Sequence, residues 1–317
     1  MPADKILVIG ANGQIGTAIL PLLHDTYGQN NIIASDLFQP VSPIGLFEIL
    51  DATNANTLAG IVKKHNITQI YHLAAILSAK GEDDPVWAWN LNMQTLLNVF
   101  EVARSCDVKK VFVPSSIAIF GPGAQKEQTP QNTYLDPATV YGISKVAAEN
   151  WSAYYHKRYG LDIRSLRYPG VISYQSMPGG GTTDYAVDMY HKAIAGENYN
   201  CYLSENTRLP MIYIDDALQA TLNLMEAAAV QIKIRSSYNL SGLSFTPSEL
   251  VKAISIHYPG FKCCFTPDFR QNIADSWPAS IDDSAARKDW GWKPAFDLEG
   301  MTSAMFSQLS ALSFKVL

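Results

Sequence analysis

The sequence is poor in cysteine and has no long hydrophobic run. Four of its 317 residues are cysteines, and they have neither the spacing of metal ligands nor the density of a disulfide-rich secreted domain. The apolar runs all stop short of the roughly 18 residues that a membrane span needs. We therefore expect no bound metal, no membrane partner, and ordinary free thiols at Cys106, Cys201, Cys263 and Cys264.

An excess of charge of either sign is also missing. The chain has 24 Lys and Arg residues against 29 Asp and Glu residues, a net charge of −5, and no basic run. This balance argues against nucleic acid and against an anionic membrane surface as partners. The first apolar run begins near residue 5, which leaves no room for a signal or transit peptide, so we expect a cytoplasmic protein.

Apolar residues are plentiful, and they recur as alternating strands and helices. They make up 47% of the chain, enough for one large domain with a lobe or for two domains in close contact. Runs at Ile6–Ile9, Ile32–Ala34, Ile70–Leu73 and Val111–Pro114 are separated by helical patterns such as Trp87–Arg104. This alternation predicts an α/β fold, a Rossmann-type doubly wound parallel sheet that binds ligands at the carboxyl ends of its strands.

A glycine-spaced turn follows the first apolar run. Gly10, Gly13 and Gly16 lie between this run and a predicted helix, where a glycine backbone lets a pyrophosphate approach the helix N-terminus. The same spacing also occurs in turns that bind nothing. Asp36 ends the next run, at the place where this fold has the carboxylate that binds the ribose hydroxyls of a dinucleotide.

Asp36 also bears on which nicotinamide cofactor the chain binds. Its carboxylate would repel the 2′-phosphate of NADP, and neither Leu37 nor Phe38 supplies a guanidinium to bind that phosphate. We therefore predict NAD. The alternative is that Asp36 is an ordinary turn aspartate at a strand end.

The regular alternation ends near Ser173. A glycine-rich stretch at 177–181, a helical pattern from Tyr185 to Ala195 and a strand-like segment at 208–216 follow it. We expect a smaller, interleaved α/β lobe that binds substrate, with a lid at the three glycines 179–181. The predicted boundaries are residues 1–172 and 208–240 for the NAD-binding domain, and residues 173–207 and 241–317 for the substrate-binding lobe.

A tyrosine and a lysine share one face of a long predicted helix. Tyr141 and Lys145 lie in a helix expected from Pro137 to Tyr159, with Asp136 as its cap and Gly160 at its end. A phenol with a pKa of about 10 must fall by roughly three units to act as a base at neutral pH. An exposed ion pair supplies only about 0 to 1 kcal/mol of the roughly 4 kcal/mol required. The lysine therefore needs burial and the positive charge of an oxidised nicotinamide, unless the pair is merely a solvated helix face.

Two serines end the fourth apolar run. Ser115 and Ser116 follow Val113 and Pro114, and their hydroxyls could orient the oxygen being oxidised toward Tyr141. The alternative is that they only form a turn. A histidine in another run, His72, is expected to be a buried core residue and not a catalyst.

These elements together resemble the extended short-chain dehydrogenase/reductase superfamily over nearly the whole chain. The superfamily has three spaced glycines, an acid after the second strand, a serine, a Tyr-x-x-x-Lys pair and an Arg-Tyr-Pro string. The matching residues are Gly10, Gly13, Gly16, Asp36, Ser116, Tyr141, Lys145, Arg167, Tyr168 and Pro169. The resemblance implies that Tyr141, Lys145 and Ser116 are catalytic, with Ser115 as the helper of Ser116.

The resemblance also implies a set of cofactor-binding residues, in which Asn92 matches the structural asparagine of the superfamily. The set is Gly10, Asn12, Gly13, Gln14, Ile15, Gly16, Asp36, Asp51, Ala52, Leu73, Ala74, Ala75, Asn92, Tyr141, Lys145, Tyr168, Pro169 and Val171.

Several strings in the second half resemble those of short-chain dehydrogenases that act on L-threonine. They lie at 167–173, 178–188, 205–211, 244–247 and 267–278. The resemblance implies oxidation of the β-hydroxyl of L-threonine by NAD to 2-amino-3-oxobutanoate. A small zwitterion needs donors for its carboxylate and an acceptor for its ammonium group. The predicted substrate-binding residues are Ser78, Ser116, Tyr141, Thr182, Thr183, Asp184 and Trp277.

Other interpretations of these residues stay open. Thr183 or Asp184 could cap the following helix, and Trp277 could belong to the core. Elimination is disfavoured, because Ile117 and Ala118 stand where dehydratases of the superfamily have an Asp-Glu pair. A nucleotide-sugar epimerase, with Arg208, Arg235 and Arg270 as the candidate pyrophosphate-binding residues, and a non-catalytic NAD-binding module remain as alternatives.

The resemblance also implies a homodimer. In this superfamily the helices that correspond to Trp87–Arg104 and Pro137–Tyr159 usually build a four-helix interface between two subunits. Trp151, Tyr154 and Tyr155 could supply its aromatic content, although a monomer could equally bury them in its core.

Overall fold

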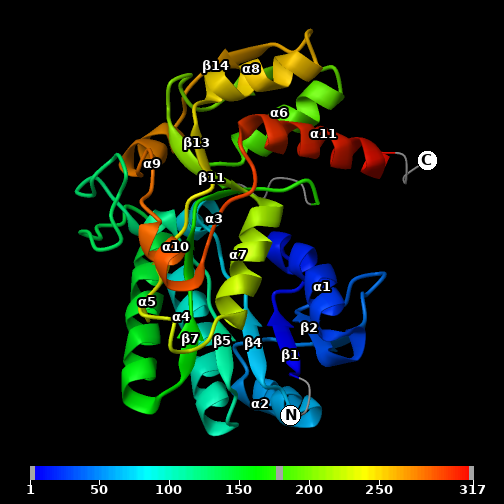
Figure 1. The fold of residues 1–317 in the computed structure, drawn as a ribbon, viewed down its shortest axis with the longest axis vertical. Helices are drawn as coiled ribbons and strands as arrows, with labels where there is room; N and C mark the ends of the chain where they lie inside the picture. The colour runs from blue at the N-terminus through cyan, green and yellow to red at the C-terminus, as the bar shows by residue number, and fades with distance from the viewer. Residues whose placement is uncertain (1–3, 176–180, 314–317) are drawn as a thin grey trace. The chain divides into compact units, whose positions relative to one another are not determined.

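Figure 1 shows the computed structural model, which describes residues 4–175 and 181–313. Within these residues the chain forms two compact units. The first comprises the chain up to Ser116 with Thr139–Arg167 and Leu218–Tyr238, and the second comprises Ile117–Ala138, Tyr168–Ala217 and the chain from Asn239 on. The predicted division into cofactor and substrate domains concerns function and stays a prediction. Of the predicted lid, residues 179 and 180 lie outside the described residues.

The first unit is built on a six-stranded parallel sheet of order β3-β2-β1-β4-β5-β7. From the central strand β1 the chain adds β2 and then β3 toward one edge. It then crosses over and adds β4, β5 and β7 toward the other edge, so a topological switch point lies between β1 and β4. The doubly wound α/β fold predicted from the sequence is thereby confirmed. The strands are β1 Ile6–Ile9, β2 Ile32–Asp36, β3 Leu46–Ile49, β4 Gln69–His72, β5 Lys110–Phe112 and β7 Asp162–Arg164.

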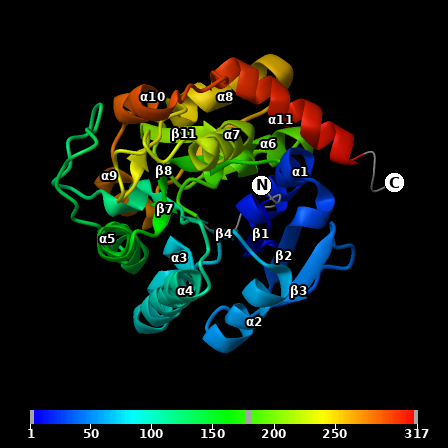
Figure 2. The same ribbon diagram turned by 60° about the horizontal axis from the view of Figure 1, so that its bottom comes forward.

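Helices cover both faces of this sheet. Because successive side chains of a strand point to opposite faces, Leu7 and Ile9 pack into a buried cluster with residues of α2, α4 and α5. Figure 2 shows α2 and α4 on one side of the sheet and α1 on the other. The helices of this unit are α1 Gln14–Tyr27, α2 Ala55–His65, α3 Ser78–Asp83, α4 Pro85–Ser105, α5 Val140–Tyr159 and the end of α7 Ile214–Glu226.

Helix α5 begins three residues later than predicted. Thr139 is extended, with φ −129°, and its hydroxyl accepts a hydrogen bond from the amide of Gly142, so Thr139 is the N-cap. The predicted cap, Asp136, instead accepts a hydrogen bond from the amide of Gly123 at 2.8 Å. The predicted end at Gly160 is confirmed, since Gly160 closes the helix in the left-handed conformation with φ 72°.

The second unit holds shorter elements around strand β11. Strand β11 pairs in parallel with β9 and antiparallel with β13, while β10 pairs with β14. Its strands and helices are β9 Gly170–Ile172, α6 Tyr185–Ile194, β10 Tyr199–Cys201, β11 Leu209–Tyr213, β13 Leu243–Phe245, α8 Pro247–His257, β14 Cys263–Phe265, α9 Arg270–Ser276, α10 Ser284–Trp290 and α11 Leu298–Ser313. A further small sheet, most of whose residues belong to the first unit, has the order β12-β8-β6, from Tyr238–Asn239, Leu166–Tyr168 and Ser115–Ser116.

None of the described helices is long and apolar enough to cross a membrane. The four cysteines are free. Among the residues that the structure describes, no group of three or more His, Cys, Asp or Glu side chains could hold a metal ion.

A buried arginine joins the last strand of the main sheet to the end of α7. The Arg164 side chain, on β7, is 1% exposed and pairs with Asp162 through two nitrogens. Its Nη1 donates to the carbonyl oxygens of Leu224, Met225 and Ala227 at 2.6 to 3.1 Å. These carbonyls lie at the C-terminal end of α7, where the helix leaves acceptors without partners of their own. The carbonyl of Met225 also accepts a hydrogen bond from Nζ of Lys110 at 2.7 Å. An apolar side chain at position 164 would therefore leave the carbonyls of Leu224 and Ala227 without this donor.

Replacing Arg164 by Met should lower the free energy of unfolding by about 3 to 5 kcal/mol, because it breaks a buried ion pair and removes the donor of two carbonyls, those of Leu224 and Ala227. Urea unfolding followed by circular dichroism measures this. Arg158→Met, at an exposed position near the end of α5, is the matched control and should change stability by no more than about 0.5 kcal/mol. Equal stability of the two variants would contradict this role of Arg164.

Candidate active site

The glycine turn brings three stretches of backbone into close contact. Gly10 has φ +86°, and a Cβ atom on it would lie 2.6 Å from the amide nitrogen of Ala74. A Cβ atom on Gly16 would lie 2.2 Å from the carbonyl oxygen of Gly10. Gly13 is the N-cap of α1 and provides no side chain to cap its amides. The turn therefore leaves the N-terminus of α1 open to an anion, as pyrophosphate binding requires.

The predicted ribose ligand lies beside this turn. One oxygen of the Asp36 carboxylate accepts a hydrogen bond from the amide of Asn12 at 2.9 Å, and the other accepts from the amide of Leu37 at 2.7 Å. The side chain of Asn12 in turn donates to the carbonyl of Phe38. The acid after β2 is thus attached to the glycine turn, and these residues fit the adenosine half of a dinucleotide.

Two asparagines of α4, Asn92 and Asn98, hold two loops of the first unit by hydrogen bonds to their backbone. The side chain of Asn92, on α4, accepts from the amide of Ile76 at 2.8 Å and donates to the carbonyl of Ile76 at 3.1 Å. This fixes the loop that contains the predicted residues Leu73, Ala74 and Ala75. Asn98 donates to the carbonyls of Ala52 and Thr53 at 2.9 and 2.8 Å, and Asp51 accepts from Thr53. The predicted cofactor-binding residues Asp51 and Ala52 therefore lie in a loop that Asn98 holds by hydrogen bonds.

Tyr141, Lys145 and Ser116 come together in the first unit. The Nζ atom of Lys145 lies 5.4 Å from the centre of the Tyr141 ring and donates to the carbonyl of Pro114 at 2.7 Å. Burial raises the pKa of the Tyr141 phenol to about 12, and its hydrogen bond with Ser116 opposes this rise. Burial lowers the pKa of Lys145 to about 8, and the charge of Glu149 opposes that shift.

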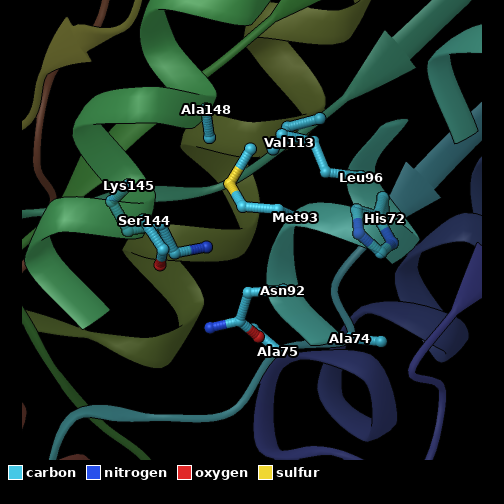
Figure 3. A pocket seen from close by; sticks show the side chains of 10 residues that line it. All are labelled: His72, Ala74, Ala75, Asn92, Met93, Leu96, Val113, Ser144, Lys145 and Ala148. Carbon is cyan, nitrogen blue, oxygen red and sulfur yellow. The ribbon is translucent and has the colours of Figure 1, made fainter. Parts of the chain in front are cut away.

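A small cavity lies behind Lys145. Figure 3 shows Lys145 and Ser144 of α5 on one side of it and His72 of β4 and Asn92 of α4 on the other. Its volume is about 20 Å³, room for one water molecule. Burial, and then the charge of Lys145, lower the pKa of His72 to about 3. His72 is therefore a neutral, buried residue whose Nε2 lies 3.4 Å from the hydroxyl of Thr95.

The remaining predicted residues are divided between the two units. Ser78 is buried at the start of α3 in the first unit. In the second unit, Gly170 packs so closely on Thr183 that a Cβ atom on the glycine would lie 2.8 Å from the Cβ of Thr183. Asp184 accepts from the amide of Gly181, and Trp277 is buried. Asp184 does stand at the N-cap of α6, but its side chain makes no capping hydrogen bond there.

Thr182 is the predicted substrate residue with an unused polar group. Its side chain is 2% exposed, and its hydroxyl has no partner among the described residues. A buried hydroxyl without a hydrogen bond costs free energy. A bound ligand could supply that hydrogen bond.

The predicted set misses one charged residue beside Lys145. Glu149 lies one helical turn after Lys145 on α5 and accepts hydrogen bonds from Ser115 and Arg167. The spacing of four residues between Lys145 and Glu149 is a signal that could have indicated it. The hydroxyl of Ser115 donates its hydrogen bond to Glu149. The predicted role of Ser115 as the helper of Ser116 at the reacting oxygen stays a prediction.

The fold and these residues define a dinucleotide-binding protein of Rossmann type with a Ser-Tyr-Lys site. Residues 6–241 match the model of the NAD dependent epimerase/dehydratase family. The match spans most of the chain, and the chain belongs to this family.

Proteins of known sequence and structure resemble it over their full length. An uncharacterized epimerase/dehydratase from Staphylococcus haemolyticus is 44% identical over 311 residues, which cover 96% of this chain and 98% of that protein. The GalE-like L-threonine dehydrogenase from Cupriavidus necator, in its holo form, is 52% identical with a TM-score of 0.95, over 96% of this chain and 100% of that one. A monomeric L-threonine 3-dehydrogenase from a metagenome database is 49% identical with a TM-score of 0.94, over 97% and 99% of the two chains.

Replacing Gly16 by Ala should weaken NAD binding at least roughly tenfold, because the new methyl group would collide with backbone and displace the turn. Titration of NAD by calorimetry measures the affinity. Gly60→Ala, on α2 with nothing within 4 Å of the added Cβ, is the control. It should leave the affinity unchanged and raise stability by up to about 1 kcal/mol. Wild-type affinity in Gly16→Ala would show that the close approach is not needed.

Proposed function

We propose that this protein is an NAD-dependent L-threonine 3-dehydrogenase that oxidises the β-hydroxyl of L-threonine to 2-amino-3-oxobutanoate. The observation that carries the proposal is the full-length similarity to two L-threonine dehydrogenases at 52% and 49% identity. The Ser116, Tyr141 and Lys145 arrangement is what an alcohol oxidation requires. A role in the breakdown of threonine and a cytoplasmic location are part of the same proposal.

The proposed cofactor is NAD, bound along the carboxyl ends of β1, β2 and β4. The glycine turn provides room for the pyrophosphate and Asp36 an acceptor for the ribose hydroxyls. Neither Leu37 nor Phe38, which directly follow Asp36, has a guanidinium that could bind a 2′-phosphate. When bound, NAD accepts a hydride at its nicotinamide ring.

In the proposed mechanism Tyr141 is the general base. Its phenolate oxygen takes the proton of the substrate hydroxyl as C3 of the substrate loses hydride, while Ser116 holds the reacting oxygen. The pKa of the phenol, about 12, has to fall by about five units for Tyr141 to act as a base at neutral pH, which corresponds to about 7 kcal/mol. Lys145, buried and hydrogen-bonded to the carbonyl of Pro114, supplies positive charge beside Tyr141. The charge of the oxidised nicotinamide would supply the rest.

For the substrate, we propose that the 182–184 segment recognises the amino-acid part of threonine. The hydroxyl of Thr182, which has no hydrogen-bond partner among the described residues, supports this, since it offers a buried donor for a carboxylate. Asp184 offers an acceptor for the ammonium group, and Thr183 is fixed against Gly170. Ser78 and Trp277 are proposed as further parts of the substrate wall.

The epimerase alternative loses support from the ion pairs of the three candidate arginines. Arg208 pairs with Glu249, Arg235 with Asp162, and Arg270 with Asp268. Each carboxylate offsets the charge of its guanidinium and so weakens the attraction of that arginine for a pyrophosphate. The alternative of a non-catalytic module loses support from the complete Tyr141 and Lys145 pair, in which Lys145 is buried.

We also propose that the protein forms a homodimer through α4 and α5. Large side chains of these helices are exposed in the single chain, among them Trp87, Ile143, Trp151, Tyr154 and Tyr159. Exposed apolar surface of this kind marks interfaces between proteins. One of the similar dehydrogenases is described as monomeric, so the assembly has to be measured.

Replacing Tyr141 by Phe should lower kcat for L-threonine by about 10² to 10⁴, because the base is lost. The formation of NADH from NAD and L-threonine, followed by absorbance, measures this, and NAD affinity should remain near that of the wild type. Tyr134→Phe, at an exposed position, serves as control. Near-normal turnover in Tyr141→Phe would refute the role of Tyr141. Wild-type protein that forms no NADH from threonine, but binds a nucleotide sugar, would favour the epimerase.

Sedimentation velocity should show a dimer for the wild-type chain and a monomer for Trp151→Arg, because a charge in an apolar interface is costly to bury. Val230→Arg, which places the same charge at an exposed site outside these helices, should stay dimeric. A wild-type chain that sediments as a monomer at micromolar concentration would overturn the proposed assembly.

A further inference from the structure

A buried charge network lies directly beneath the catalytic pair. Glu149 accepts a hydrogen bond at Oε1 from the hydroxyl of Ser115 at 2.6 Å. Arg167 donates from Nε to Oε1 at 2.9 Å and from Nη2 to Oε2 at 2.7 Å. The three residues are only 3%, 3% and 4% exposed. Both oxygens of the carboxylate are therefore held by a planar, two-pronged contact that leaves little freedom of movement.

This network connects the two segments that carry the catalytic residues. Glu149 lies on α5 one turn after Lys145. Its partner Ser115 stands between Pro114, whose carbonyl accepts from Lys145, and Ser116, which bonds to Tyr141. Two hydrogen bonds thus connect segment 114–116 to α5: Lys145 donates to the carbonyl of Pro114, and Ser115 donates to Glu149. The positions of Ser116 and Lys145 depend on both.

Glu149 also balances the charge of the buried lysine. The groups that face Lys145 from the elements packed around it are Glu149 and Tyr141 on α5, the neutral His72 on β4, the uncharged Asn92 on α4 and the carbonyl of Pro114. Burial favours loss of the lysine proton, and the negative charge of Glu149 favours its retention.

We propose that Glu149, oriented by Ser115 and Arg167, is a positioning residue of the active site that holds segment 114–116 against α5 and keeps Lys145 charged during the reaction. This inference rests on the proposed dehydrogenase function for its kinetic consequence. Its structural consequence, the charge state of Lys145, does not depend on the substrate.

The charge state can be measured directly, without turnover. Protein labelled with ¹³C at lysine Cε is titrated by NMR, and the Lys145 signal is assigned from its loss in Lys145→Arg. In Glu149→Gln the pKa of Lys145 should fall by roughly one unit or more, because a nearby opposite charge is removed. In Glu149→Asp, which keeps the charge, it should stay close to the wild-type value. An unchanged pKa of Lys145 in Glu149→Gln overturns the proposal.

The kinetic arm measures the pH profile of kcat/KM for L-threonine at saturating NAD. If loss of the lysine proton inactivates the enzyme, the alkaline limb of the profile should move to lower pH by the same amount in Glu149→Gln and remain in place in Glu149→Asp. A uniform loss of kcat/KM with an unmoved alkaline limb would mean that Glu149 is merely structural.

Glu149→Gln leaves the buried Arg167 without its anion and could fail to fold, so the double variant Glu149→Gln with Arg167→Met provides a second route. Removing both charges of a buried pair is often tolerated where removing one is not. The same two readouts apply to it, but the pKa of Lys145 should fall by less than in Glu149→Gln, because the positive charge of Arg167 is removed together with the negative charge of Glu149. A wild-type chain that does not oxidise threonine would defeat the proposed function, while the NMR titration would still decide the role of Glu149.

Discussion

The burial of one ammonium group, that of Lys145, constrains much of the first unit. An unpaired charge in a protein interior costs several kcal/mol, so every buried lysine needs acceptors and a counter-charge close by. Here the carbonyl of Pro114 accepts a hydrogen bond from the ammonium group, and Glu149 supplies the negative charge. His72, which also lines the cavity, stays neutral because burial, and then the charge of Lys145, lower its pKa. Strand β4, helix α5 and the segment after β5 are thereby fitted to the same group.

The cofactor half of the site depends on the same edge of the sheet. Parallel strands end at one edge, so the glycine turn after β1, the acid of β2 and the loop after β4 meet there. Contact between Gly10 and Ala74 leaves no space for a side chain between the turn and that loop. Asn92 holds the loop from the other side. The residues proposed for dinucleotide binding and those proposed for proton transfer therefore depend on one backbone arrangement.

Local patterns predicted the elements whose causes are local. The apolar runs of β1 and β2, and the left-handed glycine that ends α5, depend on neighbours in the chain. The pattern did not indicate β3, whose apolar side chains at Leu46 and Ile49 are exposed, or β7, which contains the buried Arg164. Arg164 and Glu149 find their partners across the fold, at residues distant in sequence. Periodicity in the sequence does not reveal such long-range pairs. The sequence therefore indicated the candidate catalytic residues but not the network that supports them.

The pair of adjacent serines shows how strand geometry divides two tasks. Ser115 and Ser116 form the short strand β6, and successive side chains of a strand point to opposite faces. Because the two hydroxyls point to opposite faces, only one of them can face the proposed reacting oxygen. Ser116 bonds to Tyr141, and Ser115 bonds to the carboxylate of Glu149. Ser115 therefore has a task different from that of Ser116. It donates a hydrogen bond to the buried carboxylate of Glu149 on α5, and the alternation of the strand directs its hydroxyl there.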